Sequence, residues 1–207
     1  MTQPETAAVA RPWTLAELRQ GIWLGYGAGD TYAHPGVAAF AAALGVSART
    51  VRRWLAGSNA PSPARAPQIR IALLPPPDVL ARQRMDRRHA ESAVKELARS
   101  RPRAASKQWR AQGWHLPHCV WLMHHELLQI RRVMVARAQP ARSTVFPDGW
   151  VIHAQLTLPT RPAAVLVKHD ILDQVAPWRV RVRADLVEDG RHESWLDTAP
   201  PVVLPVQ

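Results

Sequence analysis

Three arginines stand close together in the stretch SARTVRRW, residues 47–54, and a serine and a threonine accompany them. A guanidinium group is a planar cation that donates paired hydrogen bonds to carboxylates, phosphates and the major-groove edge of guanine. A hydroxyl can contact a base edge or a phosphate as well. If the stretch is helical, side chains three and four positions apart share its outer face. The residues with this chemistry are Ser47, Arg49, Thr50, Arg52 and Arg53.

The positive charge of the chain is concentrated in one segment. The 207 residues carry a formal net charge of +11. Residues 49–110 contain 15 Lys and Arg against 4 Asp and Glu, so this segment holds the whole excess. Concentrated positive potential attracts polyanions, because neutralised phosphates release counterions. A membrane-surface role is disfavoured, since residues 82–101 lack a bulky apolar face.

A second group of arginines follows in the basic run over residues 80–110. These side chains could bind phosphates beside the first group, or the run could be a linker helix whose charges are solvated. The two interpretations differ in salt dependence, because each neutralised phosphate steepens the dependence of log affinity on log salt by about 0.9. The arginines in question are Arg82, Arg84, Arg87 and Arg88, followed by Arg99, Arg101 and Arg103.

Metal-ligand residue types gather in GWHLPHCVWLMHHE, residues 113–126. The stretch has no CxxC pair and no HExxH helix, and Cys119 is the single cysteine of the chain, so a structural zinc site is poorly supported. The chain also lacks the GxGxxG, P-loop and GxSxG motifs. We therefore expect no metal, no cofactor and no enzyme activity. The ligand-type residues are His115, His118, Cys119, His124, His125 and Glu126.

Short helices are expected to position the first arginine group. Thr14 and Glu17 have the spacing of a capping box at a helix start. Gly45 can end a helix in a left-handed conformation, and Ser47 can cap the next one. The expected helices cover residues 14–27, 37–44, 48–56, 79–100 and 103–112, with an exposed connector at 58–67.

The second and third of these helices resemble the DNA-binding helix-turn-helix of lambda-repressor and Cro-like regulators. In that family a small residue lies four before the turn glycine, and apolar residues lie one and six after it; here these are Ala41, Gly45, Val46 and Val51. The resemblance covers about residues 14–66. It implies that the third helix lies in the major groove, with its arginines as candidates for guanine and phosphate contacts. Further apolar matches are Phe40, Leu44 and Trp54, which we expect in the core.

The C-terminal half is rich in β-branched and alternating stretches. In WRVRVRADLVE, Val180, Val182, Ala184 and Leu186 would share one face of a half-buried strand. Residues 163–175 could form a helix or a strand. We expect an α+β fold with an antiparallel sheet in this half. The expected division is a tail at 1–12, a helix-turn-helix domain at 13–78, basic linker helices at 79–112 and an α+β domain at 113–207.

Together these features predict a sequence-specific double-stranded DNA-binding protein, most simply a prokaryotic or phage transcriptional repressor. The single cysteine, the absence of an apolar run of about 18 residues and an N-terminus without a secretory pattern predict a cytoplasmic, nucleoid-associated protein. Arginine outnumbers lysine 24 to 3, a bias typical of GC-rich genomes such as those of actinobacteria and their phages.

Two alternatives remain open from the sequence. The same module could serve a phage or plasmid protein for DNA packaging, partition or replication. The histidine-rich stretch at 115–126 could instead be the centre of a metal-dependent nucleic-acid enzyme. The C-terminal domain could form a homodimer, sense a ligand or contact more DNA.

Overall fold

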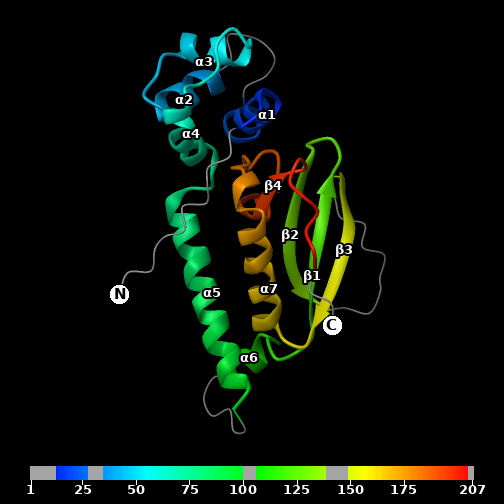
Figure 1. The fold of residues 1–207 in the computed structure, drawn as a ribbon. Coiled ribbons are helices and arrows are strands. Elements are labelled where there is room, and N and C mark those ends of the chain that lie inside the picture. Colours follow the sequence, from blue (N-terminus) through cyan, green and yellow to red (C-terminus); the bar gives the residue numbers. More distant parts are fainter. Residues whose placement is uncertain (1–12, 28–34, 100–105, 139–148, 205–207) are drawn as a thin grey trace. The chain divides into compact units, whose positions relative to one another are not determined.

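The computed structural model describes residues 13–27, 35–99, 106–138 and 149–204, and the chain divides into two compact units (Figure 1). The first, the helical unit, comprises Met1–Pro75 and Arg179–His192. The second, the sheet unit, comprises Pro76–Trp178 and Glu193–Gln207. The chain therefore contributes to the helical unit twice, and the second contribution is a short segment between parts of the sheet unit.

Short helices enclose the core of the helical unit. The expected capping box is confirmed, since the Thr14 hydroxyl accepts from the Glu17 amide and the Glu17 carboxylate accepts from the Thr14 amide. The buried side chains come from all four α-helices described in the unit and include Ile22, Phe40 and Leu73, each with no exposed surface. The helices are α1 (Leu15–Tyr26), α2 (Pro35–Ala43), α3 (Ala48–Leu55), a 3-10 turn (Pro63–Arg65) and α4 (Ala66–Leu73).

The expected connector at 58–67 is shorter than predicted, because the 3-10 turn and helix α4 begin inside that range. Pro67 is compatible with the helix, since it stands in the first turn, where a missing amide hydrogen costs nothing. Ile69 and Leu73 lie four residues apart and are both buried in the core. Their spacing is the sequence signal that a helix begins here.

The prediction of a strand over residues 178–188 is wrong. Val180 and Val182 are buried as the alternation predicts, but Ala184 is exposed and Leu186 is half-buried, and the segment is no strand of the described sheet. The Arg181 amide donates to the Leu73 carbonyl at 2.6 Å, and the Arg183 amide donates to the Leu24 carbonyl at 3.0 Å. Carbonyls in the last turn of a helix lack an intrahelical partner, so α1 and α4 offer acceptors that a neighbouring strand would otherwise provide.

The sheet unit is built on a four-stranded antiparallel sheet with the order β3-β1-β2-β4. Strands β1 and β2 form a hairpin in which His118 lies opposite Arg137 and His125 lies opposite Ile130. β3 pairs with the free edge of β1, with a register shift between Leu122 and Met123. The strands are β1 (His118–His125), β2 (Ile130–Arg137), β3 (Trp150–Leu158) and β4 (Ser194–Leu196). The expected α+β class with an antiparallel C-terminal sheet is thus confirmed.

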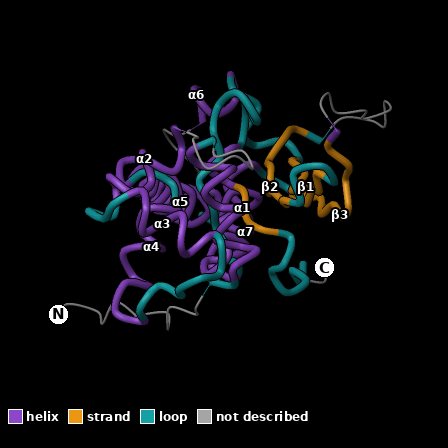
Figure 2. Tube along the Cα trace, turned by 90° about the horizontal axis from the view of Figure 1, so that it is seen from above, coloured by secondary structure: helices purple, strands orange, loops and turns teal. Residues whose placement is uncertain are grey.

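Among the described residues, three α-helices and a 3-10 turn (Ala176–Trp178) complete the sheet unit, the α-helices being α5 (Pro77–Leu97), α6 (Ser106–Ala111) and α7 (Arg161–Gln174). Helix α7 settles the open choice at 163–175 in favour of a helix. It packs on the sheet through a core that includes Val120, Val133 and Leu172. Helix α5 lies alongside α7, as both ribbon views show (Figures 1 and 2). The long basic helix is therefore packed within a folded unit. Among the described residues, no helix is long and apolar enough to cross a bilayer.

Candidate nucleic-acid interface

Two helix caps define the corner between α2 and α3. Gly45 has φ +64°, and the amides of Gly45 and Val46 donate to the carbonyls of Ala42 and Ala41, so α2 ends in a Schellman motif. Two residues later the Ser47 hydroxyl accepts from the Thr50 amide at 3.1 Å and caps α3. The predicted stop at Gly45 and start at Ser47 are both confirmed. The corner fixes the direction in which α3 leaves α2.

One face of α3 belongs to the core of the helical unit. Val51 is fully buried and Trp54 is 5% exposed, and they pack with Phe40, Ala41 and Leu44 of the preceding segment. Trp54 is thus a core residue, as expected from its spacing. Because the apolar side chains of α3 pack on the core, with Ala48 and Leu55 partly buried against it, the polar side chains of the helix are left on the opposite face.

That outer face carries the first arginine group. Arg49 and Arg53 are exposed, whereas Arg52 and Thr50 are half-buried. Arg49, Arg52 and Arg53 form no ion pair with any described carboxylate. Their guanidinium groups remain able to take an anionic partner from outside the chain.

Ser47 and Thr50 have structural duties that limit their availability. Their hydroxyl oxygens lie 2.9 Å apart in a hydrogen bond, while Ser47 also accepts from the Thr50 backbone. Both hydroxyls are thus engaged at the start of α3. They position the helix, and the exposed arginines carry most of its capacity for new contacts.

Two arginines that sequence reasoning did not select hold the ends of these helices. The Arg19 guanidinium donates to the Leu55 carbonyl, with Nε at 2.9 Å. Arg65 Nη1 donates to the Leu44 carbonyl at 3.5 Å. Both carbonyls lie just at or beyond a helix end, where backbone acceptors need partners. The sequence gives no signal for these contacts, since each joins residues at least 21 positions apart.

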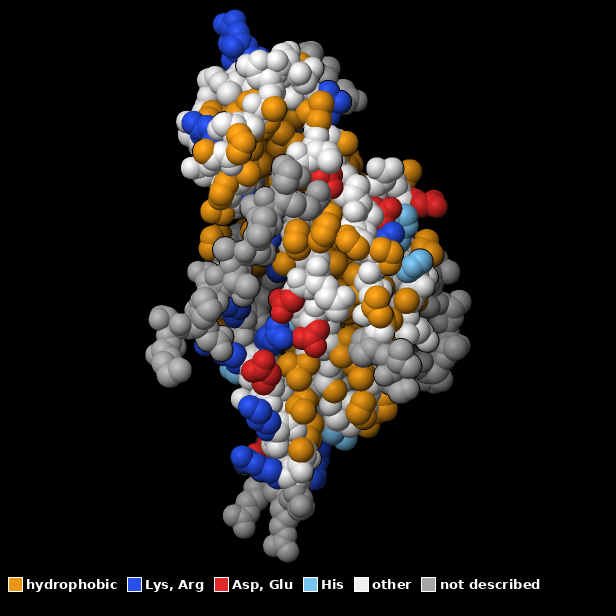
Figure 3. Space-filling model, in the orientation of Figure 1, with side chains coloured by type: hydrophobic (Ala, Val, Ile, Leu, Met, Phe, Trp, Pro, Cys, Tyr) orange, Lys and Arg blue, Asp and Glu red, His pale blue; other side chains and the backbone are white. Residues whose placement is uncertain are grey.

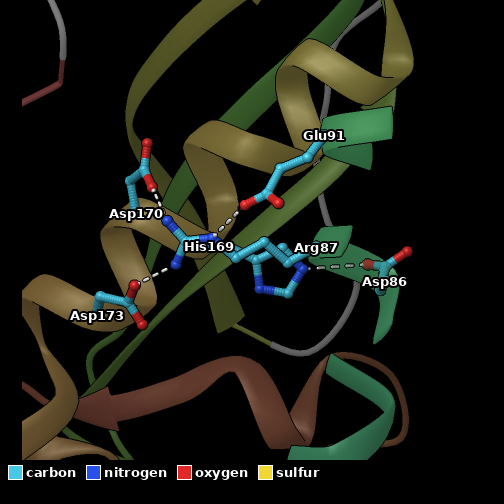
Figure 4. Close-up of polar contacts among 6 residues, drawn as sticks. All are labelled: Asp86, Arg87, Glu91, His169, Asp170 and Asp173. Atoms are coloured by element: carbon cyan, nitrogen blue, oxygen red, sulfur yellow. Dashed lines mark hydrogen bonds and ion pairs between the residues drawn. The ribbon is translucent and has the colours of Figure 1, made fainter. Parts of the chain in front are cut away.

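The arginines of α5 divide into bound and available groups. Arg87 lies between carboxylates of α5 and α7: it contacts Asp173, donates to Asp170 at 2.8 Å and reaches Glu91 at 3.4 Å (Figure 4). The hydrogen bond to Asp173 raises the pKa of Arg87 further. Arg82 pairs with Asp78 one turn earlier at 2.8 Å. Both guanidinium groups predicted here as phosphate contacts are already occupied by carboxylates of the chain.

Arg84 and Arg88 lie one turn apart on the exposed side of α5, opposite the buried Ala90 and Ala93. No carboxylate of the described residues pairs with either of them. Further along, Arg99 pairs with Glu96 at 2.7 Å, and Arg101 and Arg103 lie outside the described residues. The space-filling view shows this mixture, with basic side chains in contact with carboxylates in one place and unaccompanied in others (Figure 3).

A second ionic cluster joins α5 to α7 on the inner side. Lys168 is 9% exposed and donates to Glu193 at 2.7 Å and to Asp86 at 3.4 Å. His169 Nε2 lies 3.3 Å from the same Asp86 carboxylate. The hydrogen bond with His169, aided by the charge of Lys168, lowers the pKa of Asp86 to about 2. The cluster fixes α7 against α5 and is consistent with a structural role.

The histidine-rich stretch is distributed along β1 and its turn. His118 Nδ1 lies 2.8 Å from the Leu116 carbonyl oxygen, and Cys119 Sγ lies 3.4 Å from the Thr157 hydroxyl. His125 Nδ1 accepts from the Leu128 amide, and its ring meets Trp150 edge to face. In the part of the chain that the structure describes, no three His, Cys, Asp or Glu side chains are grouped to hold a metal ion.

Comparisons with known proteins found no relative of this chain. No protein-family model, no curated protein and no solved structure matches the chain.

Proposed function

We propose that this protein binds double-stranded DNA sequence-specifically, with α3 in the major groove. The single observation that carries the proposal is the outer face of α3, where Arg49 and Arg53 are exposed and pair with no described carboxylate, on a helix whose other face is core. A helix presented this way is what the major groove admits. The short corner at Gly45, which directs α3 away from α2, supports the same reading.

The dimensions of α3 suit this role. An α-helix with its side chains is about 10–12 Å across, which fits the width of the major groove of about 12 Å. Arg49 and Arg53 are separated by about 6 Å of helix rise, or roughly two base-pair steps. The proposed roles are guanine recognition by Arg49 and Arg53. Half-buried Arg52 is the candidate for a phosphate contact.

The exposed side of α5 offers further phosphate contacts. We assign this role to Arg84 and Arg88, because no described carboxylate competes for them. Arg82 and Arg87 are not assigned this role, since binding a phosphate would first require breaking their ion pairs within the chain.

Selection of bound duplexes from a random pool by the full chain tests the proposal. We expect enrichment of one motif that contains guanine, and a pseudo-palindromic motif if the protein binds as a homodimer. The Arg53→Ala variant should enrich the same motif with one position relaxed. Enrichment of no motif by the wild-type protein would contradict sequence-specific binding.

The regulatory role follows from where such a motif lies. A protein bound across a promoter blocks transcription, so we propose repression as the use of this activity. Motifs at promoters would support it. Motifs concentrated at a replication origin or packaging site would instead favour the assembly role.

A further inference from the structure

A cavity of about 430 Å³ lies inside the sheet unit, between α5, α6 and the first turn of α7. This volume falls in the range of small-molecule binding sites, which are mostly apolar and contain a few polar groups. The cavity is not used by the proposed DNA contacts, which are on α3 and on the exposed side of α5. Its lining includes Ala90, Ala93, Trp109, Trp114, Arg161 and Val165.

The apolar wall of the cavity suits a flat ligand. The rings of Trp109 and Trp114 lie 6.2 Å apart between centroids and are tilted by 32°. Ala90 and Ala93 are buried small residues of α5 that line the same cavity. Both indoles line the cavity, and aromatic rings favour contact with other aromatic rings, so this wall favours an aromatic body.

The cavity also holds one cation without a charge partner among the described residues. The Arg161 guanidinium lies over the Trp114 ring, with Cζ 4.6 Å from the centroid, and forms no ion pair with a described carboxylate. A guanidinium in this position is suited to a carboxylate, which it can bind through two parallel hydrogen bonds.

The other charges that line the cavity are already balanced. Asp86 is held by Lys168 and His169, and Glu96 pairs with Arg99 at 2.7 Å. The first turn of α7 offers no free amide, because the Arg161 amide donates to Trp114 and the Thr160 hydroxyl accepts from Ala163. Arg161 is thus the group that selects the charge of a ligand.

We propose that this cavity binds a small aromatic carboxylate, with its ring against Trp109 and Trp114 and its carboxylate on Arg161. The site lies wholly in the sheet unit and is independent of the proposed DNA binding. It gives the C-terminal half a role as a receptor for a small molecule.

Titration calorimetry of the full chain with three probes that share one ring system tests the charge assignment. We expect saturable binding of naphthoate, and at least about ten-fold weaker binding of naphthylmethanol and of naphthylmethylammonium. Equal affinity for the three probes would overturn the carboxylate assignment, and absence of saturable binding by naphthoate at millimolar concentration would overturn the site.

Variants locate the binding. Arg161→Gln should weaken naphthoate binding about ten- to hundred-fold, while Arg110→Gln, an equal loss of charge on an exposed residue of α6, should leave it unchanged. In nitrogen-edited NMR spectra, naphthoate should shift the indole signals of Trp109 and Trp114 but not that of Trp54 in the helical unit. Binding that survives Arg161→Gln at full strength would place the ligand elsewhere, and the indole signals of the variant show whether the cavity is still folded.

Discussion

Helices α3 and α5 are both rich in arginine, yet they present their charges differently. On α3 the outer face has no described acidic partner, so Arg49 and Arg53 are available to an outside anion. On α5 an acidic residue lies one turn from Arg82 and from Arg87, and α7 adds Asp170 and Asp173. Charge density along a sequence therefore does not measure how many guanidinium groups a partner can reach.

The physical reason is the free energy needed to replace the anion that a guanidinium group already binds. A phosphate that approaches Arg87 must replace carboxylates that already make charge-assisted hydrogen bonds, so little free energy is gained. A phosphate or guanine that approaches Arg53 replaces only water, and counterion release then favours binding. The comparison predicts that α3 determines DNA affinity and that the inner side of α5 determines stability.

The largest expected effect is a loss of stability that is confined to one of the two folded units. Phe40→Ala should destabilise the helical unit by about 3–5 kcal/mol, because the fully buried ring supports α3. Hydrogen exchange should accelerate at α3 amides and stay slow at β1 amides. Leu172→Ala in the sheet-unit core is the matched control and should show the reverse pattern. Equal acceleration in both units after either change would show that their stabilities are not separate.

The cap of α3 gives a smaller effect in the same region. Ser47→Ala should cost about 1 kcal/mol of stability, since the Thr50 amide loses its acceptor. Chemical denaturation followed at α3 measures this loss. Ser47→Asp keeps a capping acceptor and should restore stability. Its added negative charge beside Arg49 should weaken DNA binding nonetheless. A Ser47→Ala protein of unchanged stability would show that the cap contributes nothing.

The ionic cluster of Asp86, Lys168, His169 and Glu193 predicts that the stability of the sheet unit depends on pH. Because the pKa of folded Asp86 is lowered to about 2, its stabilising contribution is present above about pH 4 and is lost as the pH falls toward 2. The contribution is about 1 kcal/mol, since a side chain that is 39% exposed is partly screened by solvent. Asp86→Asn should therefore lower stability at neutral pH and flatten the acid-side decline. An unchanged decline in the variant would assign the pH dependence to other groups.

The smallest effect concerns the two kinds of arginine on α5. Arg87→Gln should cost about 0.5–1 kcal/mol of stability, and this loss should shrink in high salt because the ion pairs are partly exposed. Arg84→Gln should change stability by less than about 0.5 kcal/mol. For DNA the order reverses: Arg84→Gln should reduce the salt slope by about 0.9, and Arg87→Gln should not. Equal salt slopes in the two variants would remove the distinction.

Local features of the sequence predicted the corner between α2 and α3 and the antiparallel sheet of the C-terminal half. Gly45 and Ser47 mark the corner because a left-handed glycine and a capping hydroxyl act within a few residues. The alternation over 178–188 predicts burial correctly at Val180 and Val182 but not at Ala184, which is exposed. The hydrogen-bond partners of this segment could not be predicted. The carbonyls at the ends of α1 and α4, and not a neighbouring strand, accept its amides, and these carbonyls lie more than 100 positions earlier in the chain.

The availability of the arginines could be predicted only in part. The Arg82–Asp78 pair follows from spacing on one helix, so the sequence contains that signal. The partners of Arg87 on α7 lie 83 and 86 positions away, and no local pattern brings them together. The cavity beside Trp109 and Arg161 has the same origin, since strands β1 to β3 separate α7 from α5 and α6 in the sequence.

The most direct test compares two double variants that each remove two positive charges. Binding of Arg49→Ala/Arg53→Ala and of Arg84→Ala/Arg88→Ala is measured on the selected duplex and on a scrambled duplex. The α3 variant should lose about 2 kcal/mol or more on the selected duplex and lose its preference over the scrambled one. The α5 variant should weaken on both duplexes alike and keep the preference. An α3 variant that retains the wild-type ratio of affinities would contradict the proposal that α3 reads DNA.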